Sequence, residues 1–218
     1  MTVELSHIDK TIRGVSVLRD VSAVFPSGCI TGLAGVNGSG KTMLMRVVCG
    51  LVRQDGGMVV RDGLTVSPGS SGQGRIGLLI ENPAFLPRRS GLDNLMLLAS
   101  INNVVDDDKV QQAIASFGLD PNDRRPFSKY SLGMKQRLGL ACAFMEKPDL
   151  LLLDEPTNAL DSKGVELFKT QVKLAAKNGA TVVLACHDSQ ILRGLANQIY
   201  YLAEGHVDHY EQLKGESS

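Results

Sequence analysis

Residues 35–42 read GVNGSGKT and fit the pattern G-x-x-x-x-G-K-[ST]. The apolar run 29–34 before them predicts a buried strand, and the apolar residues of 43–49 after them predict a buried helix. In such a loop the glycines let successive backbone N–H groups turn toward a phosphate. Lys41 would reach the β- and γ-phosphates, and the Thr42 hydroxyl would be a ligand of Mg²⁺. The residues expected to contact the nucleotide here are Gly35, Val36, Asn37, Gly38, Ser39, Gly40, Lys41, Thr42 and Met43.

A second stretch places two acids at the end of an apolar strand. Residues 150–157 read LLLLDEPT, so Asp154 and Glu155 follow four leucines. Carboxylates at the end of a buried strand cost free energy unless they meet a cation or a reacting water. We therefore expect Asp154 to hold Mg²⁺ and Glu155 to orient and deprotonate the attacking water.

His187 follows the next apolar run, 181–186, and we expect it at the same edge of the sheet as Glu155. A lone histidine in this position can be a structural residue held by hydrogen bonds. With Glu155 one strand away, we favour a catalytic histidine in contact with the γ-phosphate.

Composition excludes several classes of protein. The 218 residues contain 43% hydrophobic residues, and 23 Lys and Arg balance 23 Asp and Glu, which predicts no general attraction to nucleic acid. The four cysteines have no paired spacing, so we expect neither a zinc site nor disulfides. No apolar run is long enough to span a membrane. If the protein serves a membrane, we expect another chain to cross it.

The remaining pattern predicts an α/β fold with a helical insert. Residues 3–7 and 15–25 are expected to form antiparallel strands, and a polar loop near 67–74 separates two further strands. Helical patterns fill much of the segment between Glu81 and Pro148, and the parallel-sheet pattern returns after Pro148. In the tail we expect a short helix, a strand near 199–202 and little else. The other expected strands are 58–61, 75–80, 150–153 and 181–186, and the expected helices are 91–101, 106–118, 132–146 and 163–177.

Four motifs in this order, GVNGSGKT, YSLGMKQRLGLA, LLLLDEPTNALD and ACHD, resemble the nucleotide-binding domain of an ABC-type ATPase. The resemblance runs from about residue 2 to about residue 208 and implies a single ABC ATPase domain over 1–218. It implies a P-loop α/β fold with a mainly parallel core sheet and an N-terminal antiparallel β-subdomain, together about 1–81 and 148–218. A helical subdomain carrying the signature motif would occupy about 82–147.

The resemblance also implies a head-to-tail dimer, either with a second copy or with a related ABC ATPase. The family motif LSGGQ aligns with residues 130–134, so Ser131 and the Gly133 N–H would bind the γ-phosphate of the partner's ATP. Asp161, in NALD, matches the loop that crosses the interface.

The sequence departs from the family at three positions. Glu81 replaces the usual glutamine, and as a carboxylate it can still ligate Mg²⁺ and influence catalysis. Ile12 stands where relatives place an aromatic residue that stacks on adenine, which predicts weak base selectivity. Leu132 replaces a glycine of the signature. The glutamate form, with ENPAF and YSLGMKQR together, resembles ATPase subunits of bacitracin and lantibiotic exporters.

The favoured interpretation is an ATPase that powers a membrane exporter through separate permease subunits, from the cytoplasmic face of the membrane. The alternatives are a soluble ABC ATPase that acts on cytosolic partners, as in cofactor assembly, and a P-loop kinase of a small metabolite. The signature stretch 130–137 argues against the kinase, because a kinase would need no such motif for a second subunit.

Overall fold

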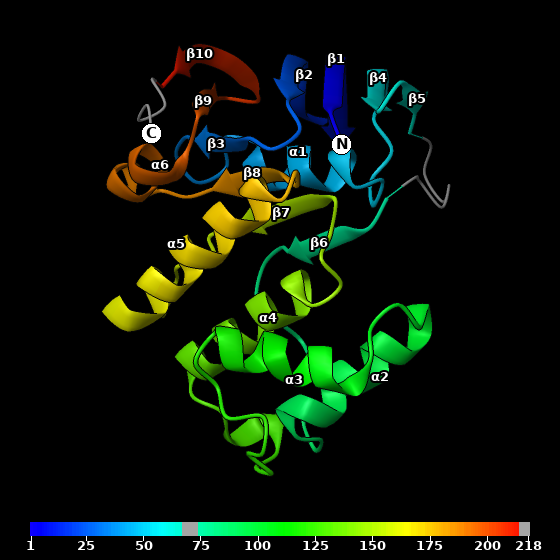
Figure 1. Cartoon of the computed structure of the whole chain (residues 1–218). Helices are drawn as coiled ribbons and strands as arrows, with labels where there is room; N and C mark the ends of the chain where they lie inside the picture. Colours follow the sequence, from blue (N-terminus) through cyan, green and yellow to red (C-terminus); the bar gives the residue numbers. More distant parts are fainter. Residues whose placement is uncertain (67–73, 214–218) are drawn as a thin grey trace.

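The computed structural model describes residues 1–66 and 74–213, which form two sheets and six α-helices (Figure 1). The strands are β1 (Val3–Ile12), β2 (Val15–Phe25), β3 (Ile30–Ala34), β4 (Gly56–Arg61), β5 (Leu64–Thr65), β6 (Ile76–Leu79), β7 (Leu150–Asp154), β8 (Thr181–Ala185), β9 (Gln198–Ala203) and β10 (His206–Gln212). The helices are α1 (Lys41–Val48), α2 (Gly91–Asn102), α3 (Asp107–Ser116), α4 (Leu132–Phe144), α5 (Ser162–Lys177), α6 (Ser189–Leu195) and the 3₁₀ turn η1 (Phe127–Lys129).

The central sheet has the order β10-β9-β3-β8-β7-β6. All neighbouring strands are parallel except β10, which pairs antiparallel with β9 at one edge. Parallel strands end at a common edge of the sheet. The segments that follow β3, β7 and β8 therefore emerge together, and these are the segments that contain the predicted catalytic residues.

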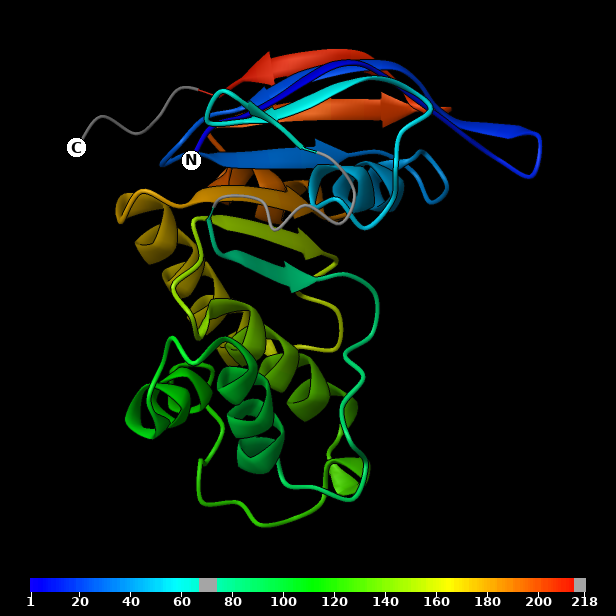
Figure 2. The ribbon, with the colours of Figure 1, turned by 90° about the vertical axis from the view of Figure 1, so that its right-hand side faces the viewer.

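The second sheet is antiparallel, with the order β2-β1-β4-β5. It lies over the central sheet, and its long β1–β2 hairpin projects to one side (Figure 2). Together with the helices between β6 and β7, the two sheets confirm the predicted fold class.

The central strands are buried on both faces because the chain supplies a separate core to each face. Along β7, Leu151 and Leu153 pack in the core that contains α5 and α6. Leu150 and Leu152 pack in the core shared with α1 and the antiparallel sheet. This explains why the strand is an unbroken apolar run rather than an alternating one.

Polar side chains cap the helices α2 to α6 at their N-termini and accept hydrogen bonds from backbone N–H groups of the first turn. These N-caps are Ser90, Asp106, Ser131, Asp161 and Asp188. Two of them, Ser131 and Asp161, are also predicted site residues. The same side chains therefore start a helix and stand at the predicted interface.

The structure contains two strands, β5 and β10, that the sequence did not predict. The tail was predicted to end with little beyond the strand near 199–202, and this is wrong, because β10 follows β9 through a tight turn. The short strand β5 was also not predicted. Most of the polar loop predicted near 67–74 lies outside the described residues.

Helix α4 approaches the sheet closely at Gly77 of β6. A Cβ at Gly77 would lie 2.0 Å from the carbonyl oxygen of Ala143 and 2.8 Å from Cδ2 of Leu151. Backbone atoms cannot yield as a flexible side chain can. Glycine is therefore required here for close packing, and the contact fixes the end of α4 against the sheet.

We predict that Gly77→Ala lowers the free energy of unfolding by about 1–3 kcal/mol, because the added methyl overpacks this contact. The matched control is Gly194→Ala in α6, where an added Cβ meets no atom within 4 Å. In a helix, that control should stabilise the protein by about 0.5–1 kcal/mol. Urea denaturation of both variants measures the difference, and equal effects would contradict the packing argument.

Candidate functional site

The loop between β3 and α1 bends sharply at Gly35, where the predicted phosphate loop begins. Gly35 has a φ of 147°, and a Cβ there would lie 2.3 Å from the carbonyl oxygen of Leu202. The Lys41 ammonium is buried and donates to the carbonyl oxygens of Gly35 (2.7 Å) and Val36 (3.0 Å). The hydroxyl of Ser39 is buried and has no hydrogen-bond partner among the described residues. A buried ammonium and an unpaired hydroxyl in one loop fit an anionic ligand.

Thr42 and Asp154 face each other across the end of the sheet. The Thr42 hydroxyl donates to Oδ2 of Asp154 at 2.5 Å. Asp154 is only 8% exposed, and this burial raises the pKa of its carboxyl, while the Thr42 hydrogen bond lowers that pKa. Oxygen ligands of this kind suit Mg²⁺. A bound cation would offset the cost of burying the carboxylate.

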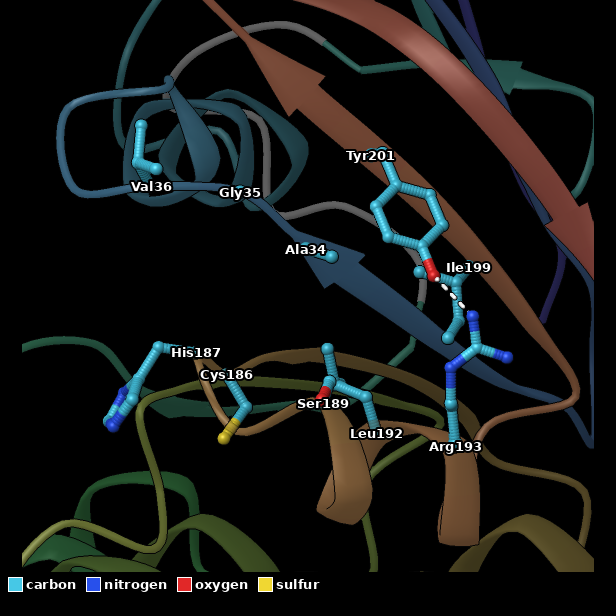
Figure 3. Close-up of a pocket in the computed structure, with 10 residues that line it drawn as sticks. All are labelled: Ala34, Gly35, Val36, Cys186, His187, Ser189, Leu192, Arg193, Ile199 and Tyr201. Atoms are coloured by element: carbon cyan, nitrogen blue, oxygen red, sulfur yellow. Dashed lines mark hydrogen bonds between the residues drawn. The ribbon is translucent and has the colours of Figure 1, made fainter.

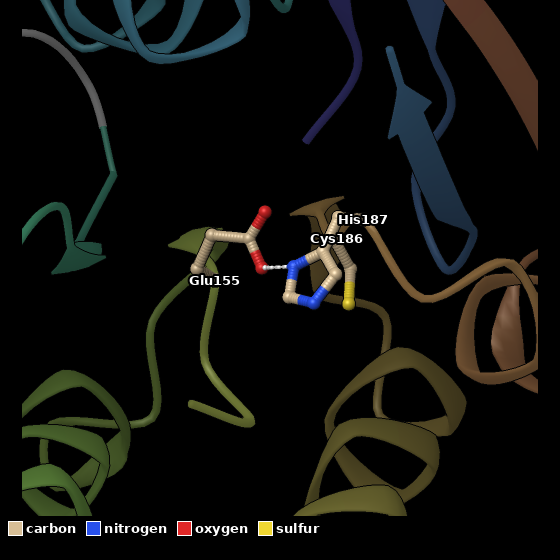
Figure 4. Close-up of side chains that lie close together, drawn as sticks. All are labelled: Glu155, Cys186 and His187. Atoms are coloured by element: carbon tan, nitrogen blue, oxygen red, sulfur yellow. Dashed lines mark hydrogen bonds and ion pairs between the residues drawn. The ribbon is translucent and has the colours of Figure 1, made fainter. Parts of the chain in front are cut away.

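Glu155 and His187 form a pair at the same edge (Figure 4). Nδ1 of His187 lies 2.7 Å from Oε2 of Glu155. Because an ionised carboxylate can only accept, this contact puts the proton on Nδ1 and leaves Nε2 as the other polar atom of the ring. His187 is largely exposed and Glu155 is partly buried. The structure thus joins the predicted base to the predicted histidine.

The thiol of Cys186 lies beside this pair, and its Sγ, the His187 ring and the Glu155 carboxylate have ligand atoms within 4.8 Å of one another. Burial raises the pKa of the Cys186 thiol. All four cysteines are free.

A cavity of about 300 Å³ opens next to the phosphate loop (Figure 3). Its wall is mostly apolar and includes Val36, Leu192 and Ile199, with His187 at one end. At the other end Arg193 donates to the hydroxyl of Tyr201 at 3.2 Å. The cavity borders the loop at Gly35 and Val36, the two residues whose carbonyl oxygens accept hydrogen bonds from Lys41.

Glu81 follows β6 and forms an ion pair with Arg46 of α1, with 2.5 Å between Oε1 and Nη2. Arg46 lies one helical turn after Thr42. Glu81 has a φ of 64°, which is unusual for a residue other than glycine. The departure from the family glutamine therefore comes with a positively charged neighbour on the helix that carries Thr42.

The signature residues line a different cavity from the one beside the phosphate loop. Ser131 and Gly133 line a second cavity, of about 360 Å³, together with Asp161 and Arg137. Leu132 is 66% exposed, so its side chain points away from the core. Ile12 ends β1 and is 37% exposed, and no finding places it against a nucleotide base. Its effect on base selectivity stays a prediction.

Three further residues contact the predicted site residues Glu81, Glu155 and Asp161, and the sequence analysis did not identify them. Arg46 contacts Glu81, Gln136 contacts the backbone after Glu155, and Arg137 forms an ion pair with Asp161. Their spacing offered a signal, because residues three and four positions apart share one face of a helix. Gln136 and Arg137 stand three and four positions after Gly133, and Arg46 four after Thr42.

In the described part of the chain, no helix is both long and apolar enough to cross a membrane.

Comparisons with known proteins agree with this geometry. A family model described as ABC transporter matches residues 18–158. The ABC transporter ATP-binding protein YybJ of Bacillus subtilis is 37% identical over 97% of this chain and 97% of its own length. The bacitracin transport ATP-binding protein BcrA of Enterococcus faecalis is 35% identical over 94% of this chain and 67% of its own. The lantibiotic transport ATP-binding protein SrtF of Streptococcus pyogenes is 30% identical over 94% and 88%.

The fold is likewise similar to solved structures. The dimeric structure of MJ0796, a bacterial ABC transporter cassette, has a TM-score of 0.90 at 24% identity, and covers 98% of this chain and 99% of that one. A family model that matches well over half of the residues, and relatives that are similar over nearly the whole length, establish that this chain belongs to the ABC transporter family as one of its ATP-binding ATPases.

Proposed function

We propose that this chain is the ATP-hydrolysing subunit of an exporter for peptide antibiotics or related compounds. The observation that carries the proposal is the pairing at one edge of the sheet, where Thr42 meets Asp154 and Glu155 meets His187. The substrate class rests on the relatives whose names give bacitracin and lantibiotic transport. Separate permease subunits would cross the membrane, and the chain would lie against their cytoplasmic side.

In this proposal the phosphates of ATP lie in the loop 35–42, where Lys41 would exchange its two carbonyl contacts for phosphate oxygens. Thr42 and Asp154 would hold Mg²⁺, which supplies charge neutralisation at the phosphates when bound. Glu155 would accept the proton of the attacking water, and His187 would orient Glu155 through Nδ1 and contact the γ-phosphate.

The second cavity, here called the signature cavity, supports a site shared between two subunits. It is the one lined by Ser131, Gly133, Arg137 and Asp161. Ser131 and Gly133 stand at the N-terminus of α4, where backbone N–H groups favour an anion. They line a cavity apart from the one beside the phosphate loop. A head-to-tail pair of chains would bring each signature to the partner's ATP. We also infer that residues of about 82–147, which contain α2, α3 and α4, act as a helical subdomain.

The second candidate is an ABC ATPase that works on cytosolic partners. Affinity purification from cells separates the two candidates, because an exporter subunit should bring down a protein with many membrane spans. Recovery of soluble proteins alone would favour the second candidate.

We predict that Glu155→Gln slows ATP hydrolysis by at least about a hundredfold, because the proposed base is lost. With Mg-ATP, this variant should double its molar mass, because the closed dimer can no longer hydrolyse its ATP. Light scattering measures the mass. Adding Lys41→Ala in the same chain is the control, and it should abolish the doubling together with ATP binding. A Glu155→Gln chain that binds Mg-ATP and stays monomeric would contradict the self-dimer.

We predict that Arg46 competes with Mg²⁺ for the carboxylate of Glu81. In a Glu155→Gln background, Arg46→Gln should lower the Mg²⁺ concentration needed for half-maximal binding of a fluorescent ATP by about two- to fivefold, the range for one exposed ion pair. The same change in a chain that also carries Glu81→Gln should have no effect, because no carboxylate remains to be released. An equal shift in both backgrounds would mean that Arg46 acts through another group.

A further inference from the structure

One face of α4 packs against residues 155–161, the segment that begins with the proposed base Glu155. Gly133, Gln136 and Arg137 share this face, because they stand at positions i, i+3 and i+4 of the helix. A Cβ at Gly133 would lie 2.7 Å from the carbonyl oxygen of Ala159, so the helix start touches the loop after Glu155 directly. The signature helix and residues 155–161 therefore form one packed unit.

Gln136 makes the contact nearest to the reaction. Its side chain is 7% exposed, and its Nε2 donates to the carbonyl oxygens of Glu155 (3.3 Å) and Pro156 (3.0 Å). The Glu155 carbonyl oxygen also accepts from the N–H of Asn158 at 3.2 Å, so the Gln136 amide is one of its two donors and links it to the carbonyl of Pro156.

The backbone of Glu155 needs such support. Its φ is 47°, in the left-handed region that residues other than glycine rarely adopt. Its N–H donates to the carbonyl oxygen of Ala185 at the end of β8, at 2.9 Å. The peptide groups on either side of the Glu155 Cα are therefore held from two directions, by β8 and by α4.

Arg137 connects α4 to Asp161, at the far end of the segment 155–161. Its guanidinium forms an ion pair with Asp161 and donates to the carbonyl oxygen of Phe117 at 3.1 Å. The Arg137 side chain is only 12% exposed, whereas that of Asp161 is 67% exposed, so the ion pair joins a buried guanidinium to a carboxylate at the surface. Through Gln136 and Arg137, α4 contacts both ends of the segment 155–161.

We propose that Gln136 is a positioning residue for ATP hydrolysis, an inference that rests on the proposed role of Glu155 as the base. Its amide holds the strained backbone of Glu155 so that the carboxylate points at the attacking water. Ser131, at the start of the same helix, would bind the partner's phosphate, so the helix transmits closure of the dimer to the base. A shift of about 1 Å in a catalytic group can cost on the order of a hundredfold in rate.

The chain offers a matched control for a merely structural amide. Gln198 of β9 is 6% exposed, and its Nε2 donates to the carbonyl oxygen of Val24 (2.7 Å) and the hydroxyl of Thr31 (2.9 Å). It matches Gln136 in burial and in the two hydrogen bonds that its Nε2 donates, and its Oε1 also accepts from the Tyr210 hydroxyl at 3.2 Å. It holds the two sheets together rather than the base.

The experiment compares Gln136→Met with Gln198→Met by melting temperature, by affinity for ATP and by kcat. Both variants should lose similar thermal stability and bind ATP within about twofold of the parent chain, because neither residue touches the phosphate loop. Only Gln136→Met should lower kcat, by about tenfold to a hundredfold. A similar kcat for both variants would overturn the proposal. A parent chain without ATPase activity would instead refute the proposed function.

A second variant keeps the test open if Gln136→Met does not fold. The carboxyl introduced by Gln136→Glu has the same shape, and only when protonated can it donate, through its single O–H, to one of the two carbonyl oxygens. Its kcat relative to the parent should therefore rise as the pH falls, and Gln198→Glu should show no such rise. A constant ratio to the parent across the pH range would overturn the proposal.

Discussion

The buried carboxylate of Asp154 is the constraint on which the site depends. It ends a strand whose five residues are all buried, and its charge must be stabilised where water is scarce. The structure meets this need by bringing Thr42, at the start of α1, within hydrogen-bonding distance. That contact requires β3 and β7 to end at the same edge, with β8 between them. The contact between Thr42 and Asp154 therefore depends on the order of strands β3, β8 and β7.

The same edge gives Glu155 its partner. His187 follows β8, the direct neighbour of β7, so a histidine 32 residues away in sequence comes within 2.7 Å of the carboxylate. The backbone of Glu155 leaves the strand with a positive φ of 47°, and the two neighbouring carboxylates have different partners. Two adjacent acids can then take two different roles, one beside Thr42 and one beside His187.

Helix α4 connects the signature cavity to the loop that carries Glu155. Its first turn lines the signature cavity, and its next turn contacts the backbone that carries Glu155 and Asp161. Its far end is fixed against β6 by the close contact at Gly77. The helix therefore forms a continuous packed connection from the signature cavity to the loop that carries Glu155.

The fold class and most strands and helices follow from local patterns such as apolar runs, and the positions of the glycine loop 35–42 and of the two carboxylates can be read from the same patterns. The pairs Thr42–Asp154 and Glu155–His187 could be anticipated from strands that end at one edge. The folded arrangement was needed to find that Arg46 pairs with Glu81, that Gln136 binds the Glu155 carbonyl and that Arg137 pairs with Asp161. These contacts join helices to loops through side-chain reach and crossing geometry. Helical spacing places Gln136 and Arg137 on the face of Gly133, and Arg46 on that of Thr42, but it does not specify which polar residues outside those helices they meet.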